Sequence, residues 1–296
     1  MPDYGELFLL VSPRGRRSLR RLTQGQDIHG ADGVIPAETL AGTDFGTEVR
    51  TLLGAPYRIM RPTLCDLTRG VKRQTQILYP KDIGYICMRL GVGNGTRIIE
   101  AGSGSGGLTV ALSWLSGERG HVYTYEARQE FYDLCGRNLA WAGVGDNVTR
   151  HLRDIGEGFL QTDADALFLD LRTPWDYLGQ VTAAVRPGAP LAFLLPTVEQ
   201  VSLLLAALEK GPFDDIEVEE ILARGWKPAA GRLRPQDRMV AHTGFLVFAR
   251  KQERSADFEA RKPLGTRERK RQKALRELED AREEARDGLD LGENSG

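Results

Sequence analysis

The sequence has few cysteines and no excess of charge of either sign. Its 296 residues include three cysteines, Cys65, Cys87 and Cys135, which form no C-x-x-C pair and have no histidine at metal-ligand spacing. Neither a disulfide framework nor a zinc site is therefore expected. The formal net charge is −1, whereas a nucleic-acid partner usually leaves a basic surface, so any such surface must be local.

Long apolar runs are also missing. No segment approaches the roughly 20 apolar residues of a membrane-spanning helix, and the acidic start, residues 1–5, lacks the basic and apolar regions of a signal peptide. We therefore expect a cytoplasmic protein with no membrane partner. Hydrophobic residues make up 41% of the chain and charged residues 27%, which is ordinary for globular proteins, so most of the chain should fold.

Basic residues gather in two places near the start. The first cluster comprises Arg14, Arg16, Arg17, Arg20 and Arg21, and the second comprises Arg69, Lys72 and Arg73. Taken alone, each cluster fits solvated surface charge better than a nucleic-acid contact. Phosphate contacts to RNA are the alternative that the rest of the sequence must support.

Residues 1–63 predict a small all-β domain. Short β-like runs at residues 7–11, 33–35, 48–53 and 57–60 are separated by glycine, proline, aspartate and serine. An amphipathic stretch at residues 83–90, which Asp82 is suited to cap, then opens the next domain.

Residues 64–250 predict an α/β domain with a mainly parallel sheet. Strands are expected at 97–101, 121–125, 148–152, 166–171, 191–195, 216–222 and 244–250, and helices at 106–115, 128–141, 175–185 and 198–208. Strands that alternate with helices imply parallel crossovers and helices on both faces. Only a loop, residues 225–243, separates the last two strands, so these should pair antiparallel. Beyond residue 250 the charged stretch 251–296 predicts a mobile tail.

A glycine-rich loop follows the first strand of this domain. Gly102, Gly104 and Gly107 satisfy G-x-G-x-x-G between a strand and a helix, and Glu126 ends the next strand, where an acid that binds ribose is expected. Glycines let the backbone turn tightly beneath a ligand, with a helix N-terminus below it. The motif alone fits a nicotinamide, a flavin or S-adenosylmethionine.

Glu100 separates these cofactors. It lies two residues before the first glycine, where an acid suits a cationic methionine moiety and would repel a pyrophosphate. Glu126 would accept hydrogen bonds from the ribose hydroxyls, and Asp154 with Ile155 would meet the adenine, although either acid alone also fits a helix cap. The expected residues for S-adenosylmethionine are Glu100, Gly102, Gly104, Ser105, Gly106, Gly107, Leu108, Glu126, Arg128, Phe131, Asp154, Ile155 and Asp170.

Asp170 is the expected reaction centre. It ends an apolar strand, and ligands of open α/β sheets bind outside the carboxyl ends of strands. Pro174 and Trp175 follow it, in the place where amino-methylating enzymes carry an Asp or Asn before a proline and an aromatic residue. An isolated motif of this kind would favour a helix cap, but the glycine loop makes the reaction site the better interpretation.

Together these motifs resemble those of the bacterial and archaeal tRNA (adenine-58-N1)-methyltransferases. The resemblance covers residues 5–250 and is carried by Arg61-Pro62-Thr63, Lys72-Arg73, Tyr79-Pro80-Lys81-Asp82, Glu100 to Leu108, Tyr125-Glu126-Ala127-Arg128, Asp170, Pro174-Trp175, Leu195-Pro196 and His242-Thr243-Gly244-Phe245. It implies a small N-terminal β domain, a Rossmann-like methyltransferase domain, a tRNA substrate, a homotetramer and Asp170 as a catalytic residue. Residues 74–78 and the charged tail depart from the family pattern and receive no role.

The chemistry of adenine then gives a mechanism as a hypothesis. Adenine N1 attacks the sulfonium methyl group, and Asp170 accepts a hydrogen bond from the exocyclic N6 amino group, which stabilises the cation that develops on the base. Tyr79 would position the adenine, or else pack at the domain junction. Two rivals stay open: a methyltransferase acting on another RNA base, on small molecules or on protein carboxyl groups, and a non-catalytic RNA-binding subunit. Retention of both the glycine loop and Asp170 favours the enzyme.

Overall fold

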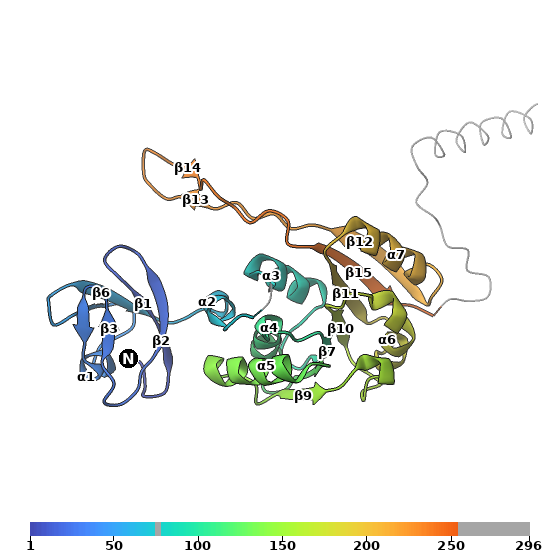
Figure 1. Ribbon diagram of the computed structural model, residues 1–296, viewed down its shortest axis with the longest axis horizontal. Coiled ribbons are helices and arrows are strands. Elements are labelled where there is room, and N and C mark those ends of the chain that lie inside the picture. Colours follow the sequence, from blue (N-terminus) through green and yellow to red (C-terminus); the bar gives the residue numbers. More distant parts are fainter. Residues whose placement is uncertain (75–77, 254–296) are drawn as a thin grey trace, which may run out of the picture. The chain divides into compact units, whose positions relative to one another are not determined.

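The N-terminal part of the chain is a four-stranded antiparallel sheet. The computed structural model describes residues 1–74 and 78–253 (Figure 1). The sheet has the order β2-β1-β6-β5, and a separate hairpin, β3-β4, and a helix, α1, complete this part. The bounds are β1 (Leu7–Val11), β2 (Arg17–Arg21), β3 (Ile28–Gly30), β4 (Gly33–Ile35), α1 (Ala37–Ala41), β5 (Glu48–Arg50) and β6 (Pro56–Met60).

Helix α1 and strands β2 and β3 of this part were not predicted. The α1 helix, which buries Ala37 and Leu40, means that the module is not all-β. Strand β2 was not expected, because four of its five residues are arginine or serine and show no apolar alternation. It forms because β1 supplies a paired edge, with Leu9 opposite Leu19, and tertiary pairing overrides weak strand propensity.

The second sheet has seven strands in the order β12-β15-β11-β10-β7-β8-β9. Strands β7 to β11 run parallel to one another, whereas β15 lies antiparallel between β11 and β12. The predicted antiparallel pairing of the last two strands is therefore confirmed. The bounds are β7 (Arg97–Ala101), β8 (His121–Glu126), β9 (Val148–Leu152), β10 (Ala166–Leu169), β11 (Pro190–Leu195), β12 (Phe213–Glu219) and β15 (Phe245–Lys251).

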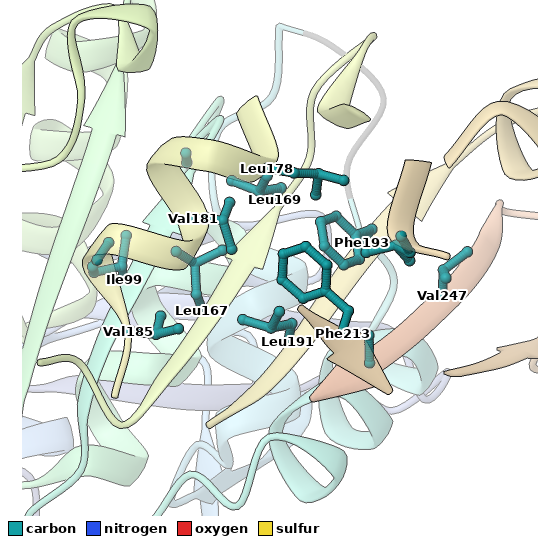
Figure 2. Packing of buried hydrophobic residues seen from close by; sticks show 14 of the residues in the cluster. Ile99, Leu167, Leu169, Leu178, Val181, Val185, Leu191, Phe193, Phe213 and Val247 are labelled. Atoms are coloured by element: carbon teal, nitrogen blue, oxygen red, sulfur yellow. The ribbon is translucent and has the colours of Figure 1, made fainter. Parts of the chain in front are cut away.

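Helices cover both faces of this sheet, as the Rossmann-like prediction requires. On one face α6 (Leu178–Ala184) and α7 (Val198–Leu208) pack on alternate strand residues; Figure 2 shows Leu178 and Val181 of α6 beside Leu167 and Leu169 of β10. The other face carries α3 (Pro80–Arg89) and α4 (Gly107–Ser116), and α5 (Gln129–Ala142) packs alongside α4. Buried apolar area on both faces is the main stabilising contribution.

Several element boundaries differ from the prediction. The expected helix at 175–185 begins as a 3-10 turn, η2 (Pro174–Tyr177), before α6, and the strand expected at 216–222 is β12, three residues earlier. The expected loop 225–243 contains a small hairpin, β13 (Trp226–Lys227) with β14 (Arg234–Pro235).

The helix start near Asp82 was also misplaced. Helix α3 begins at Pro80, because proline suits the first helical position. Asp82 therefore lies inside the first turn, where its carboxylate accepts hydrogen bonds from Lys81 at 2.7 Å and from Thr243 at 2.9 Å. An unpredicted helix, α2 (Leu64–Gly70), precedes it and starts with a capping box between Thr63 and Asp66.

Residues 1–253 form one compact unit. The Arg17 guanidinium pairs with Asp66 at 2.8 Å, and Arg21 donates to the carbonyl of Trp141, so these two arginines of the first basic cluster bind within the protein. Leu7 of β1 shares an apolar cluster with Leu67 and Val110. The tail was predicted to start at residue 251, but Lys251 is the last residue of β15; residues 254–296 of the predicted tail lie outside the described residues.

Membrane-spanning helices and metal or disulfide sites, which the sequence did not predict, can be compared with the structure. Among the described residues, no helix is long and apolar enough to cross a membrane. In the same part of the chain no three side chains of the metal-binding types gather as a metal site would require, and all three cysteines are free thiols.

Candidate cofactor pocket and active site

A cavity of about 470 Å³ lies at the carboxyl ends of β7, β8 and β10. This is where open α/β sheets bind ligands. Every predicted cofactor residue lines it except Gly106 and Phe131. The full lining is Leu78, Glu100, Ala101, Gly102, Ser103, Gly104, Ser105, Gly107, Leu108, Tyr125, Glu126, Ala127, Arg128, Arg153, Asp154, Ile155, Phe168, Asp170, Leu171, Arg172 and Tyr177.

The glycine loop needs glycine for two distinct reasons. Gly102, Gly104 and Gly106 have φ values of 87°, 50° and 77°, a region that side chains with a Cβ rarely adopt. A Cβ on Gly102 would also lie 2.3 Å from the backbone oxygen of Asp170, so the loop and the end of β10 approach too closely for any side chain. These glycines therefore determine the backbone path of the loop that lines the cavity.

Gly106 and Phe131 act at a distance from the cavity. A Cβ on Gly106 would lie 2.8 Å from the Cys135 Sγ atom, so this glycine lets the loop pack on α5. Phe131 is 4% exposed, and the Cζ atom of the Arg128 guanidinium lies 4.0 Å from the centroid of the Phe131 ring. The structure does not bring either residue to the ligand space.

Glu100 is the most buried acid of the site. It is 1% exposed, and its Oε2 atom accepts hydrogen bonds from the hydroxyls of Thr109 and Thr124, both at 2.7 Å. Burial raises the pKa of Glu100 to about 7; the two hydroxyls oppose that rise, and the nearby charges of Asp170 and Glu126 add to it. A cation entering the cavity would favour the ionised form.

Glu126 holds the glycine loop. Its Oε2 atom accepts a hydrogen bond from the Gly104 amide at 3.1 Å, and its Oε1 atom accepts one from the Arg128 amide, also at 3.1 Å. The carboxylate still lines the cavity. It therefore fixes the loop and presents acceptors at the end of β8, where ribose hydroxyls are expected.

Asp154 does act as a cap. Its carboxylate accepts a hydrogen bond at 2.7 Å from the Gly156 amide at the start of a 3-10 turn, η1 (Ile155–Glu157), as the alternative interpretation supposed. Asp154 and the buried Ile155 nevertheless line the cavity. Capping thus positions both residues at the cavity wall.

Asp170 does not act as a cap. The residue before η2 is Thr173, and among the described residues no hydrogen bond engages the Asp170 carboxylate. The side chain is exposed by accessible area because it faces the open cavity. Protein surrounds that cavity, however, and the reduced solvation, together with the charge of Glu126, raises the pKa of Asp170 to about 6.

Tyr79 lies beside the cavity and does not line it. It is half-buried and immediately precedes α3, while its neighbour Leu78 reaches the cavity wall. The predicted role of Tyr79 in positioning the base stays a prediction.

Sequence reasoning missed several residues of the wall. Tyr125, Phe168, Arg172 and Tyr177 line the cavity. Tyr125 and Phe168 lie near the carboxyl ends of β8 and β10, and the other two follow β10 within eight residues, so the strand-end rule that found Asp170 also pointed to this region.

The cavity has the donors and acceptors that S-adenosylmethionine requires. Ser105 lines it with a buried hydroxyl for which residues 1–74 and 78–253 offer no hydrogen-bond partner, an arrangement that proteins avoid unless a ligand or water completes it. Glu100 offers a carboxylate to an ammonium group, and Glu126 offers one to ribose hydroxyls. This donor set fits the predicted cofactor.

A second cavity, of about 440 Å³, lies on the N-terminal sheet beside the β3-β4 hairpin. We call it the arginine groove, because Arg14, Arg16 and Arg20 line it. All three are exposed, and within residues 1–74 and 78–253 no ion pair engages them. Tyr57 and Asp32 share a hydrogen bond of 2.9 Å at its other wall. The groove is a local basic surface, which the net charge of the whole sequence did not exclude.

Comparison with known proteins agrees with the geometry. Residues 57–234 match the family described as "tRNA methyltransferase complex GCD14 subunit". The chain is 36% identical over 248 residues to the tRNA (adenine(58)-N(1))-methyltransferase TrmI of Thermus thermophilus. The aligned region covers 82% of this chain and 96% of that protein.

Solved structures give the same family. The tRNA (m1A58) methyltransferase TrmI of Aquifex aeolicus is 37% identical, with a TM-score of 0.74, over 85% of this chain and 99% of that one. A Thermotoga maritima structure titled as an S-adenosylmethionine-dependent O-methyltransferase is 40% identical, with a TM-score of 0.81, over 86% of this chain and 96% of that one. A glycine loop, a strand-end carboxylate and the antiparallel seventh strand thus meet in a chain that belongs to the tRNA methyltransferase family of the GCD14 subunit.

Proposed function

We propose that this protein transfers a methyl group from S-adenosylmethionine to N1 of adenine 58 in the T-loop of tRNA. The observation that carries the proposal is the Asp170 carboxylate, which lies in the same cavity as the glycine loop and has no other hydrogen-bond partner among the described residues. The relatives named above support the choice of tRNA as the substrate.

Asp170 is proposed to act on the base. S-adenosylmethionine supplies the methyl group on a sulfonium centre. As N1 of adenine forms its new bond, positive charge spreads to the N6 amino group, and the ionised Asp170 carboxylate would accept a hydrogen bond from that group. A preorganised carboxylate lowers the free energy of the transition state more than that of the bound substrate, because the positive charge on the base exists only as the bond forms.

The remaining cavity residues are proposed to hold the cofactor. Glu100 would bind the methionine ammonium group, Glu126 the ribose hydroxyls, and Asp154 with Ile155 the adenine amino group and ring. Gly102, Gly104, Ser105, Gly107, Leu108 and Arg128 would shape the space between them, and Gly106 and Phe131 would support the loop and Arg128. Tyr79, at the start of α3, would place the target base. Holding N1 in line with the methyl group supplies much of the remaining acceleration.

The substrate geometry requires base extrusion. N1 belongs to the Watson–Crick edge of adenine, so a base that is stacked or paired in folded tRNA must leave that arrangement before N1 reaches the cavity. The arginine groove and Arg172 are proposed to hold the tRNA backbone during this step, because structured RNA is bound largely through phosphates and shape.

The expected organisation of the protein belongs to the same proposal. We infer an N-terminal domain at residues 1–63, a catalytic domain at 64–250, and a cytoplasmic homotetramer. Exposed apolar side chains near the β13-β14 hairpin, Trp226 at 52%, Leu233 at 67% and Met239 at 42% exposure, support a contact with another copy of the chain.

The test is a methyl-transfer assay with a mapped product. Purified protein is incubated with labelled S-adenosylmethionine and an unmodified tRNA transcript, and the modified nucleoside is identified and located. Label in 1-methyladenosine at position 58 supports the proposal, and a transcript with guanine at position 58 is the matched control. Label at position 57, at another base, or in protein carboxyl groups would assign a different substrate. Absence of transfer, with S-adenosylmethionine bound, would favour a non-catalytic subunit.

A further inference from the structure

Two buried hydroxyls meet one oxygen of Glu100. Glu100 and Thr124 are directly opposite each other in the parallel pairing of β7 with β8, so their side chains share one face of the sheet. Thr109 comes from α4, which covers that face. Both hydroxyls donate to the same atom, Oε2, at 2.7 Å.

Glu100 is the acceptor that both threonine hydroxyls share, and the Thr109 oxygen also accepts a weak 3.6 Å hydrogen bond from the Cys135 thiol. Thr109 is 0% exposed and Thr124 is 2% exposed, and the surrounding cluster on this face is apolar, with Ile98, Val122 and Phe168. A buried hydroxyl is costly unless it forms a hydrogen bond, and a valine would fill either space with similar volume. The polar atoms are therefore matched to the Glu100 carboxylate.

The other carboxylate oxygen is left for a ligand. Among the described residues no hydrogen bond is donated to Oε1, while Glu100 lines the cavity. We propose that Thr109 and Thr124 are positioning residues for cofactor binding: they anchor Oε2, favour the ionised form of the carboxylate, and leave Oε1 to accept the ammonium group of the methionine moiety. This inference rests on the proposed function.

The charges around Glu100 explain why two donors are present. Burial is the largest effect that disfavours the negative charge of Glu100, and the charges of Asp170 and Glu126 add to it. Burial, with the Glu100 charge adding to it, raises the pKa of the Cys87 thiol on α3 to about 12 and that of the Cys135 thiol on α5 to about 11, so both stay neutral. Within the described residues the two threonine hydroxyls are the groups that favour the ionised form before the cofactor arrives.

The test measures S-adenosylhomocysteine binding by calorimetry from pH 6 to pH 9. This probe carries the same amino-acid moiety and tolerates alkaline solution. Thr109→Val combined with Thr124→Val removes both donors and should raise the pKa of Glu100 by about 1.5. The two hydrogen bonds are each taken to favour the charged form over the neutral form by about 1 kcal/mol, and one pKa unit is about 1.4 kcal/mol. The Kd ratio of variant to wild type should then be about 10 to 30 at pH 6–7 and below about 2 at pH 9.

The ratio isolates the proposed role. The amino group of the ligand titrates equally in both proteins, so its effect cancels. A purely structural loss of binding would not recover as the pH rises, whereas loss of ionisation does. Thr109→Ser with Thr124→Ser retains both hydroxyls and should restore the wild-type profile. Repeating the comparison in an Asp170→Asn background removes the other carboxylate whose titration could imitate the result.

Each possible result either supports or overturns the inference about the two threonines. A Kd ratio that does not change with pH, or serine variants no better than valine variants, would overturn the inference. If the double valine variant does not fold, Thr124→Val alone is measured, and it should show about half of the shift on a logarithmic scale. Failure of the wild-type protein to bind the probe would refute the proposed function instead, so the two failures are distinguishable.

Discussion

Burial of Glu100 should make the empty protein less stable at neutral pH, and Glu100→Gln should reverse this. The folded state holds the pKa of Glu100 at about 7, against 4.5 for the free side chain. Glutamine has the shape of the protonated acid, and its carbonyl can accept the two threonine hydrogen bonds. The substitution therefore removes the cost of burying a charge and leaves the packing unchanged.

The sign and size of the effect follow from proton linkage. Below pH 4.5 the carboxyl group is protonated in both states, so the substitution should be neutral. Between pH 4.5 and 7 the unfolded state ionises while the folded state retains its proton, so stability falls as the pH rises, and above 7 the loss is constant. A pKa difference of about 2.5 corresponds to about 3 kcal/mol, or roughly 6–12 °C in Tm for a protein of this size.

The assay is thermal or chemical unfolding of wild type and Glu100→Gln, without cofactor, at pH 5 and pH 8. We expect a gain below about 1 kcal/mol at pH 5 and about 3 kcal/mol at pH 8. Glu118→Gln is the matched control, because it removes one negative charge from an exposed position. Equal gains at both pH values, or no gain at pH 8, would show that the folded protein does not hold Glu100 against ionisation.

Three further predictions follow from the site and the groove. Asp170→Asn should lower kcat by about 10²–10³. Wild-type activity should fall towards acidic pH, because the ionised form of Asp170 is lost; its pKa is about 6 in the empty protein, and a bound sulfonium cation moves this loss to lower pH. A pH profile without this acidic limb would contradict the assigned role. Alanine at all three unpaired arginines of the arginine groove should weaken tRNA binding and reduce its salt dependence by a slope of about 2–3, while Arg119→Ala, an exposed arginine outside the groove, should change little; equal effects in a filter-binding titration would argue against a tRNA contact there. Gly102→Ala should destabilise the protein by about 1–3 kcal/mol or more from its positive φ and close contact, and an unchanged denaturation midpoint would show that the loop can rearrange.

The sequence was most informative where local patterns and tertiary structure agree. The glycine loop, the alternation of strands and helices, and Asp170 at a strand end are all local signals, and the structure brings Gly102 and Asp170 into contact. Strand β2 was missed because its arginines leave no apolar alternation, and the strand is specified by its pairing with β1.

The rest of the site depends on contacts between distant segments. Thr109 and Thr124 look like ordinary helix and strand residues, and nothing in their local sequence indicates that both reach Glu100. Asp82 looked like a helix cap, but Pro80 sets the start of α3, and Lys81 and Thr243 engage the carboxylate instead. Such roles become visible only when the sheet register and the packing of α4 are known.

The order of the seven-stranded sheet also has a consequence for aggregation. An outer strand offers unpaired backbone groups to any passing chain. Here β12 is interrupted by a bulge between Asp214 and Glu217, and it carries acids that pair with Arg89. The opposite edge, β9, carries Arg150, which bonds back to the carbonyl of Tyr132. Both margins of the sheet are thus charged or irregular, which discourages edge-to-edge association between molecules while the flat faces stay covered by helices.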